Sequence, residues 1–305
     1  MITIISTQAE SKPLRFVVIS DSNDRYGKVY QGMGVDDAIE AIVHHIRPDF
    51  VIHNGDMIAG QLHNLSREEI VAMWKGYHNQ VTYQLMSNGI PLVPVTGNHD
   101  ADPRFVDREV YLKEWTRPSF KPDLDYLDDG NYPFFYAFSH GESAFIILDA
   151  PTGRVSPEQL SWLNTVLQDT QLFSYRFVFS HVPFAKFIER SYGELQPRDA
   201  LYDLFIKYKV TLLFSGHYEI YYRGRFRDLD IVSTGQLSHT CRVPLGQKEC
   251  QGMSIVVVEV RPNQPPVVIG LTEPDFLTVF DEDDLPPVCG ENYLLRMMPI
   301  WPWRF

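Results

Sequence analysis

The sequence predicts an α/β fold whose sheets are covered by helices, and two observations favour it. Strand-like apolar runs alternate with segments of helical spacing through the first two thirds of the chain, which is typical of βαβ units. Five apolar runs also end on side chains that bind metals in proteins, at Asp21, Asp56, Asn98, His181 and His217. Each run reads as a buried strand, so each of these side chains is expected at the carboxyl edge of a sheet.

Helices are expected between these strands. After a strand at 14–20, a helix is indicated by apolar residues at helical spacing, at Val35, Ile39, Ile42 and Ile46. Residues 66–69 read Ser-Arg-Glu-Glu, a capping box that predicts the start of a helix running towards residue 86. Ser156, with Pro157 at the first helical position, predicts the start of another. These helices are expected to form the scaffold.

The last third changes to strands without intervening helices, at 220–226, 229–233, 254–260 and 267–271. We expect them to form antiparallel meanders that complete a second sheet. Residues 1–272 are expected to form one domain, because no internal repeat or low-complexity linker is visible. Residues 273–305 read as a C-terminal extension. Since its Trp301, Trp303 and Phe305 are costly to leave in water, the extension is expected to pack on the domain or on a partner chain.

The strand ends predict a metal centre, because ligands of open α/β sheets gather in the crevice outside the carboxyl ends of the strands. The ordered set Asp, Gly-Asp, Gly-Asn-His-Asp, His and Gly-His resembles the calcineurin-like metallophosphoesterase family. The motif Gly97-Asn98-His99-Asp100 is the most specific piece of this resemblance. The similarity runs from about residue 15 to about residue 235, which is most of the chain.

This resemblance implies two stacked mixed β-sheets flanked by helices, a four-layer αββα sandwich with two divalent metal ions at one edge. Asp56 would bridge the ions, and Asn98, His181 and His217 would complete the second metal site. His99 would protonate the leaving oxygen, and Asp100 would orient its ring. The implied reaction is hydrolysis of a phosphate ester by direct attack of water.

The first metal site is where this sequence departs from the family pattern, which begins Asp-x-His and ends Gly-His-x-His. Here Asn23 and Glu219 stand at two of the histidine positions, so the site would consist of oxygen donors from Asp21, Asn23, Asp56 and Glu219. Oxygen-rich sites suit Mn²⁺ or Mg²⁺, and imidazole suits Mn²⁺, Fe²⁺ or Zn²⁺. We therefore expect an asymmetric metal pair. The alternatives are that Asp24 replaces Asn23 as a ligand, or that the first site has decayed.

Three residues are candidate substrate contacts. Arg25 and Tyr26 follow the first strand within a few residues of Asp21, and Arg25 would either clamp a phosphate oxygen or remain a solvated loop arginine. Arg190 lies between His181 and the next expected helix, where it could belong to the rim of the pocket.

Composition limits the partners. A net charge of −12 argues against a surface that binds nucleic acid, whereas bound metals would still admit a small anionic substrate. The first 13 residues lack the pattern of a signal peptide, and no apolar run approaches membrane-spanning length, so we expect a cytoplasmic protein without membrane contact. Cys241 and Cys250 bracket an expected loop and could pair across it, although ordinary thiols are the simpler interpretation.

The favoured function is a metal-dependent phosphoesterase that acts on a small phosphomonoester or phosphodiester. The competing hypothesis is a metallophosphoesterase-like binding scaffold, in which the altered first site has decayed and hydrolysis is lost. The sequence leaves the assembly state open, including a homo-oligomer.

Overall fold

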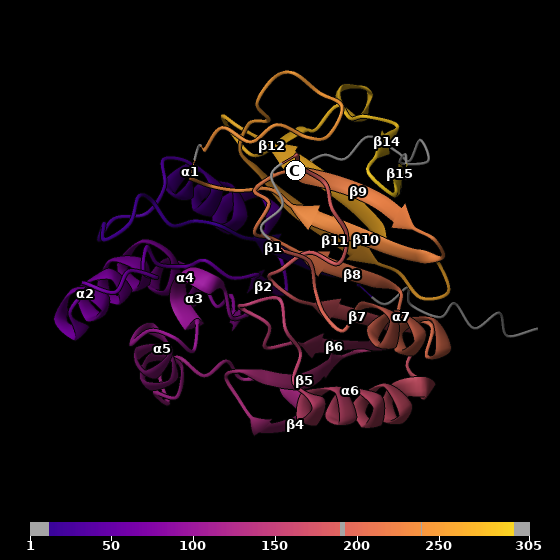
Figure 1. The fold of residues 1–305 in the computed structure, drawn as a ribbon, viewed down its shortest axis with the longest axis horizontal. Helices are drawn as coiled ribbons and strands as arrows, with labels where there is room; N and C mark the ends of the chain where they lie inside the picture. Colours follow the sequence, from indigo (N-terminus) through magenta and orange to yellow (C-terminus); the bar gives the residue numbers. More distant parts are fainter. Residues whose placement is uncertain (1–11, 190–192, 239, 296–305) are drawn as a thin grey trace, which may run out of the picture.

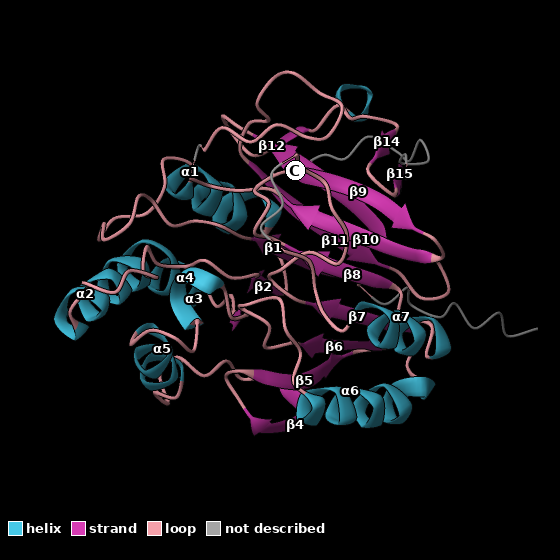
Figure 2. Ribbon diagram, in the orientation of Figure 1, coloured by secondary structure: helices cyan, strands magenta, loops and turns pink. Residues whose placement is uncertain are grey.

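The computed structural model describes residues 12–189, 193–238 and 240–295. Two mixed β-sheets lie against each other in this part of the chain, and helices cover the outer face of each sheet (Figure 1). Figure 2 shows the strands as a central block, with helices on either side of it. The predicted four-layer αββα sandwich is therefore confirmed.

The first sheet contains the strands that carry three of the five expected site segments. Its members are β1 (Leu14–Ile19), β2 (Phe50–His53), β3 (Leu92–Pro94), β11 (Ser254–Val260), β12 (Val267–Thr272) and β13 (Thr278–Val279). They lie in the order β13-β12-β11-β1-β2-β3. Strands β1, β2 and β3 run parallel, so their carboxyl ends point to one edge of the sheet.

The second sheet carries the other two site segments. Its members are β4 (Asp125–Asn131), β5 (Phe135–His140), β6 (Ser143–Ile147), β7 (Tyr175–Phe179), β8 (Leu212–Ser215), β9 (Tyr221–Phe226), β10 (Leu229–Thr234), β14 (Val288–Cys289) and β15 (Asn292–Leu294). Their order is β14-β15-β9-β10-β8-β7-β6-β5-β4. The four neighbours β6, β7, β8 and β10 are parallel.

The helices flank the sheets as their apolar faces require. They are α1 (Val35–Glu40), α2 (Arg67–Tyr77), α3 (Tyr83–Ser87), α4 (Asn98–Ala101), α5 (Asp107–Trp115), α6 (Pro157–Asp169) and α7 (Arg198–Lys207). Buried residues of α1, α2 and α5 pack on the first sheet, and those of α6 and α7 pack on the second. The expected capping box is present, because the Ser66 hydroxyl accepts from the Glu69 N–H and the Glu69 carboxylate accepts from the Ser66 N–H.

Strand β1 shows how one strand is buried on both faces. Phe16 and Val18 belong to the core between the sheets, whereas Val17 and Ile19 belong to the core under the helices. The Phe16 ring lies edge-on to the rings of Phe145 and Phe177 from the opposite sheet. Full burial of such a side chain contributes about 1.5–3 kcal/mol. This packing fixes β1, and therefore the position of the residue that follows it.

The C-terminal strands form as expected but do not complete a single sheet, so that prediction is wrong. Strands β9 and β10 pair in the second sheet, whereas β11 and β12 join the first sheet beside β1. The antiparallel meander β4-β5-β6 was not predicted from the sequence. Its first strand is a largely exposed edge strand of mostly polar residues, so it lacks the apolar pattern of a buried strand.

Residues after position 272 add strands to both sheets. Strand β13 pairs with β12, and the hairpin β14-β15 pairs with β9. Trp301, Trp303 and Phe305 lie outside the described residues. Among the helices of the described ranges, none combines the length and apolar character that a membrane crossing needs.

Candidate metal centre

Five strand ends from two sheets meet at one edge of the sandwich. Asp21, Asp56 and Asn98 follow β1, β2 and β3, while His181 and His217 follow β7 and β8. Ligand atoms of Asp56, His181 and His217 lie within 4.8 Å of one another, as one compact group of potential metal ligands. The predicted convergence of these strand ends is present in the structure.

His181 is the centre of what we call the histidine half of the site, made of Asp56, Asn98, His181 and His217. Its Nε2 atom lies 3.0 Å from Asn98 Oδ1 and 3.3 Å from Asp56 Oδ2. Its Nδ1 atom lies 2.8 Å from the Asn54 carbonyl oxygen. A backbone carbonyl at Nδ1 fixes the ring and leaves Nε2 directed at the site, as in many histidine ligands of metals.

Burial and neighbouring charges set the protonation of this half. Burial opposes ionisation of Asp56, but His181 and His99 outweigh it and hold the pKa of Asp56 below its ordinary value. Burial would lower the pKa of His181, but the Asp56 carboxylate raises it to about 10. Burial, reinforced by the neighbouring His181 charge, lowers the pKa of His217 to about 3. His217 is therefore a neutral imidazole, the form that binds metals.

Glycine precedes three of the site residues, because backbone or side-chain atoms of other segments approach it closely there. A Cβ atom on Gly97 would lie 2.1 Å from the Asp56 backbone nitrogen. A Cβ atom on Gly216 would lie 2.0 Å from Ser20 Oγ and 2.7 Å from Asp21 Oδ2. These distances are far below van der Waals contact, so only glycine fits at either position.

Four site residues adopt left-handed backbone conformations that are uncommon outside glycine. Their φ angles are 49° at Asp21, 58° at Asp56, 65° at His217 and 58° at Glu219. Such conformations cost free energy, and they persist where the surrounding structure enforces them. Their concentration at one sheet edge is a second sign of a functional site, and no residue pattern in the sequence indicated it.

The Gly-Asn-His-Asp motif forms the short helix α4 beside Asp56. The His99 backbone N–H donates to Asp56 Oδ1 at 2.9 Å, and His99 Nε2 lies 3.8 Å from Asp56 Oδ2. Asp100 does not orient the His99 ring, contrary to the expectation. Its two oxygens accept from the backbone N–H groups of Gly97 and Met57, each at 2.7 Å, and His99 Nδ1 is buried without a hydrogen-bond partner. Asp100 therefore holds the turn that presents His99.

Asp21, Asn23 and Glu219 form what we call the oxygen half of the site, and they are engaged differently. Asp21 Oδ2 accepts from the Ser20 hydroxyl at 2.5 Å and from the His217 N–H at 3.0 Å. Asn23 takes part in a backbone bridge with Gln31. Glu219 Oε1 accepts from Arg242 Nη2 at 2.8 Å. The oxygen half thus contains an ion pair that the sequence did not indicate.

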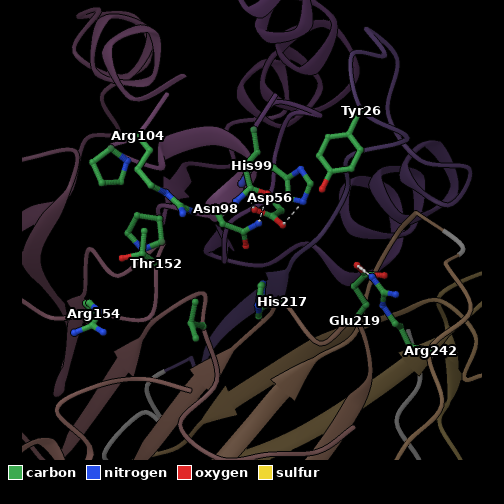
Figure 3. A pocket seen from close by; sticks show the side chains of 14 residues that line it. Tyr26, Asp56, Asn98, His99, Arg104, Thr152, Arg154, His217, Glu219 and Arg242 are labelled. Atoms are coloured by element: carbon green, nitrogen blue, oxygen red, sulfur yellow. Dashed lines mark hydrogen bonds and ion pairs between the residues drawn. The ribbon is translucent and has the colours of Figure 1, made fainter. Parts of the chain in front are cut away.

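A cavity of about 790 Å³ opens over both halves. Five polar or charged residues of its lining were not predicted from the sequence, namely Gln61, Arg104, Thr152, Arg154 and Arg242. Figure 3 shows Arg104 and Arg154 on one side of the cavity and Arg242 on the other, with His217 between them. Gln61 and Arg104 follow site motifs closely in the chain, which is a weak signal. Nothing in the sequence singled out the other three.

The candidate substrate contacts have different outcomes. Tyr26 lines the cavity, and its ring centroid lies 4.9 Å from that of His99. Arg25 is exposed and is not among the residues that line the cavity in the described ranges. Arg190 lies outside the described residues. Of the two candidates within the described residues, Tyr26 lies next to the expected chemistry and Arg25 does not line the cavity.

A disulfide joins Cys241 and Cys250, whose Cα atoms are 5.0 Å apart. The simpler interpretation of two ordinary thiols is therefore wrong. Cys289 is a free, buried cysteine. Because disulfides persist mainly in oxidising compartments, the pairing counts against the cytoplasmic location expected from the sequence.

The histidine half fits a divalent metal ion. It offers a carboxylate, an amide oxygen and two imidazoles, and three of these side chains already have ligand atoms within 4.8 Å of one another. In the oxygen half, Glu219 is paired with the Arg242 guanidinium. Within the described residues, neither Asp21 nor Glu219 belongs to the group of potential metal ligands formed by Asp56, His181 and His217. As arranged here, the oxygen half does not fit a second ion.

The fold is a four-layer αββα sandwich, and carboxylate and imidazole side chains that could hold a metal ion gather at the ends of its strands. A family model described as calcineurin-like phosphoesterase matches residues 14–218, and the chain belongs to this family. The resemblance stated from the motifs is thus confirmed. Proteins of the family bind divalent metals, and its named relatives include phosphatases.

Known proteins that the chain resembles include a rat protein named serine/threonine-protein phosphatase CPPED1. The two are 27% identical over 238 residues, which cover 72% of this chain and 68% of the rat protein. The structure of purple acid phosphatase PPD1 from yellow lupin superposes with a TM-score of 0.62 at 16% identity, over 86% of this chain. The chain spans only about half of the lupin enzyme, 52%.

GAP50 of Plasmodium, described as the anchor in the inner membrane complex, has the same fold. It superposes with a TM-score of 0.61 at 15% identity, over 94% of this chain and 90% of GAP50. At such identities these two likenesses establish the fold alone.

Proposed function

We propose that this protein is a metal-dependent phosphoesterase that hydrolyses a small phosphomonoester or phosphodiester. The observation that carries the proposal is the histidine half itself, with Asp56, His181 and His217 gathered beside His99 on the wall of a cavity. The expected ion there is Mn²⁺, Fe²⁺ or Zn²⁺, because two imidazoles and an amide suit these metals.

The histidine half would hold the ion through Asp56, Asn98, His181 and His217. An ion bound there supplies a Lewis acid that polarises the phosphoryl group and acidifies water. The second ion that the resemblance implies is a separate question, because Glu219, one of its expected ligands, is already paired with Arg242.

His99 is the proposed general acid. Its side chain is 18% exposed and borders the cavity, so it can reach a substrate and exchange protons with water. Its backbone N–H is bound to Asp56, and its ring lies next to that of Tyr26. The short helix α4 thereby fixes His99 beside the proposed metal ligands, where it can protonate a departing oxygen.

The cavity favours a small anionic substrate. Arginines 104, 154 and 242 line it, although the whole chain carries a net charge of −12. A concave site with several guanidinium groups attracts phosphate in an otherwise acidic protein.

The altered oxygen half favours a second candidate, a binding scaffold without hydrolysis. The name of GAP50, an anchor protein with the same fold, is consistent with this candidate. The preserved histidine half favours the enzyme, because a scaffold has no need for a buried carboxylate, amide and two imidazoles around one point.

The test is hydrolysis of matched aryl phosphomonoester and phosphodiester substrates by metal-stripped protein resupplied with Mn²⁺, Mg²⁺, Ca²⁺, Zn²⁺ or Fe²⁺. We expect activity that a metal restores and that His99→Ala lowers about 10²- to 10⁴-fold while the protein retains its metal. Equal loss of metal and turnover in His99→Ala would contradict the role of His99. Folded wild-type protein that is inactive with each metal and with their mixtures would favour the scaffold.

A further inference from the structure

The oxygen half contains a positive charge supplied by the protein itself. Glu219 stands where the family pattern has a histidine, and its Oε1 atom accepts from Arg242 Nη2 at 2.8 Å. The two side chains are only 15% and 26% exposed. An ion pair shielded to this degree is stronger than a surface pair, so Arg242 neutralises a carboxylate that would otherwise be available to a metal ion.

The loop that carries Arg242 is fixed to the sheet at several points. The disulfide Cys241–Cys250 closes the loop directly beside Arg242. The Gln251 N–H donates to the Arg242 carbonyl at 2.9 Å, and the Gln251 side chain donates to the Tyr221 carbonyl in β9 at 3.0 Å. The disulfide and these hydrogen bonds therefore constrain the backbone that carries Arg242, and Glu219 holds its guanidinium.

Arg242 also reaches the space in which a substrate would bind. It lines the same cavity as His99 and His217. Figure 3 shows the pair of Glu219 and Arg242 at the side of the cavity opposite Arg104, with its charged groups close to the level of His217. A guanidinium has five N–H donors in a planar fork, so it can bind a carboxylate and a phosphate oxygen at the same time.

We propose that Arg242 takes the place of the first metal ion, so that the centre holds one divalent ion and binds the substrate phosphate through that ion and the Arg242 guanidinium. This inference rests on the proposed function, since it assigns the phosphate of the same substrate to Arg242. It also gives a reason why glutamate replaces histidine at position 219. A carboxylate forms an ion pair with arginine, whereas an imidazole carries no negative charge.

The competing occupant of the same space is a second metal ion. Asp21 Oδ1 and Glu219 Oε2 are buried and make no hydrogen bond, and they would be its ligands after Arg242 had moved away. Moving Arg242 would cost free energy, because a mostly buried guanidinium would lose its carboxylate. The two occupants predict different numbers of bound ions per chain.

The first experiment counts the metal. Metal-stripped protein is loaded with Mn²⁺, desalted and analysed by inductively coupled plasma mass spectrometry. We expect one Mn²⁺ per chain in the wild type and in Glu219→Ala, and none in His181→Ala. Arg225→Ala is the matched control, since Arg225 forms an ion pair with Asp230 on β9 and β10 and does not line the cavity.

The second experiment measures the affinity of the Mn²⁺-loaded protein for inorganic phosphate by isothermal titration calorimetry. We expect Arg242→Ala to weaken phosphate binding at least about tenfold, as loss of a charge-assisted hydrogen bond implies. Arg242→Lys is expected to recover part of the loss, and Arg225→Ala to bind like the wild type. If Arg242→Ala does not fold, Arg242→Gln removes the charge while keeping an N–H donor.

Two results would overturn the inference and leave the proposed function intact. One is two Mn²⁺ per chain in the wild type falling to one in Glu219→Ala, because Glu219 would then be a metal ligand. The other is unchanged phosphate affinity in the Arg242 variants. Wild-type protein that retains no ion from any of the five metals would instead contradict the proposed function, and the inference with it.

Discussion

The histidine half and the oxygen half of the centre lie side by side but are built differently. In the histidine half, side-chain atoms of Asp56 and Asn98 converge on His181 within 3.3 Å. In the oxygen half, Asp21 is engaged by a hydroxyl and a backbone N–H, and Glu219 by a guanidinium. Similar strand ends can therefore present either a group of potential metal ligands or an ion pair, depending on which distant residue reaches them.

The largest expected effect is a difference in kcat/KM between two variants, each of which removes the carboxylate charge from one half of the centre. Asp56→Asn should lower kcat/KM by about 10³-fold or more, because Asp56 is the carboxylate of the proposed metal site. Glu219→Gln should lower it by about tenfold or less, because Arg242 remains beside the cavity. Steady-state kinetics with one aryl phosphate substrate gives both values. Equal losses of kcat/KM in the two variants would mean that both carboxylates contribute equally to catalysis, which would contradict the distinction between the halves.

The next effect concerns the close backbone approach at the histidine half. Gly97→Ala would place a Cβ atom 2.1 Å from the Asp56 backbone nitrogen, so we expect a loss of about 2–4 kcal/mol in the free energy of unfolding. Urea denaturation measures it. Gly130→Ala is the control, since its nearest neighbour lies at 3.5 Å. A Gly97→Ala protein as stable as the control would show that the strand ends can separate easily.

The pH dependence of metal binding distinguishes the roles of the His181 and His217 imidazoles. Asp56 raises the pKa of His181 to about 10, while burial lowers the pKa of His217 to about 3. At neutral pH His181 must release a proton to bind metal, whereas His217 need not. The affinity for Mn²⁺ should therefore rise about tenfold per pH unit between about pH 7 and pH 9. Calorimetry in buffers of different ionisation enthalpy counts the released proton, and an affinity independent of pH would contradict this assignment.

The smallest expected effect on the centre is that of the disulfide next to the oxygen half. In denatured, unreduced protein, one thiol should react with Ellman's reagent, namely Cys289, and three should react after reduction. Replacing Cys241 and Cys250 together by serine should weaken phosphate binding a few-fold and leave Mn²⁺ retention unchanged. Three reactive thiols before reduction would show that the loop is not closed in solution.

Much of the fold could be predicted from short stretches of sequence. The capping box at Ser66 and the cap at Ser156 begin helices where expected, because a cap involves only neighbouring residues. The strands that end at the site were also found, since their apolar runs are continuous. The edge strand β4 was missed because it is mostly polar. The split of the C-terminal strands between two sheets was missed because pairing partners are not encoded in strand patterns.

The candidate site, like the fold, could be predicted only in part from the sequence. The sequence identified the residues at the strand ends, because their chemical types and order are local facts. It misassigned Asp100, whose oxygens bind the backbone of Gly97 and Met57. Whether a carboxylate faces a ring or a backbone N–H depends on rotamers and on the approach of a second strand.

The α/β class, the helix starts and the ligand types at five strand ends follow from the amino-acid sequence alone, because periodicity and side-chain chemistry are properties of neighbouring residues. Tertiary packing is needed to bring Glu219 to Arg242, 23 positions away. It also imposes the left-handed backbone conformations of Asp21, Asp56, His217 and Glu219. These features arise where separate chain segments pack together. Their distances and strain come from the packing of the two sheets and their loops, which no short segment contains.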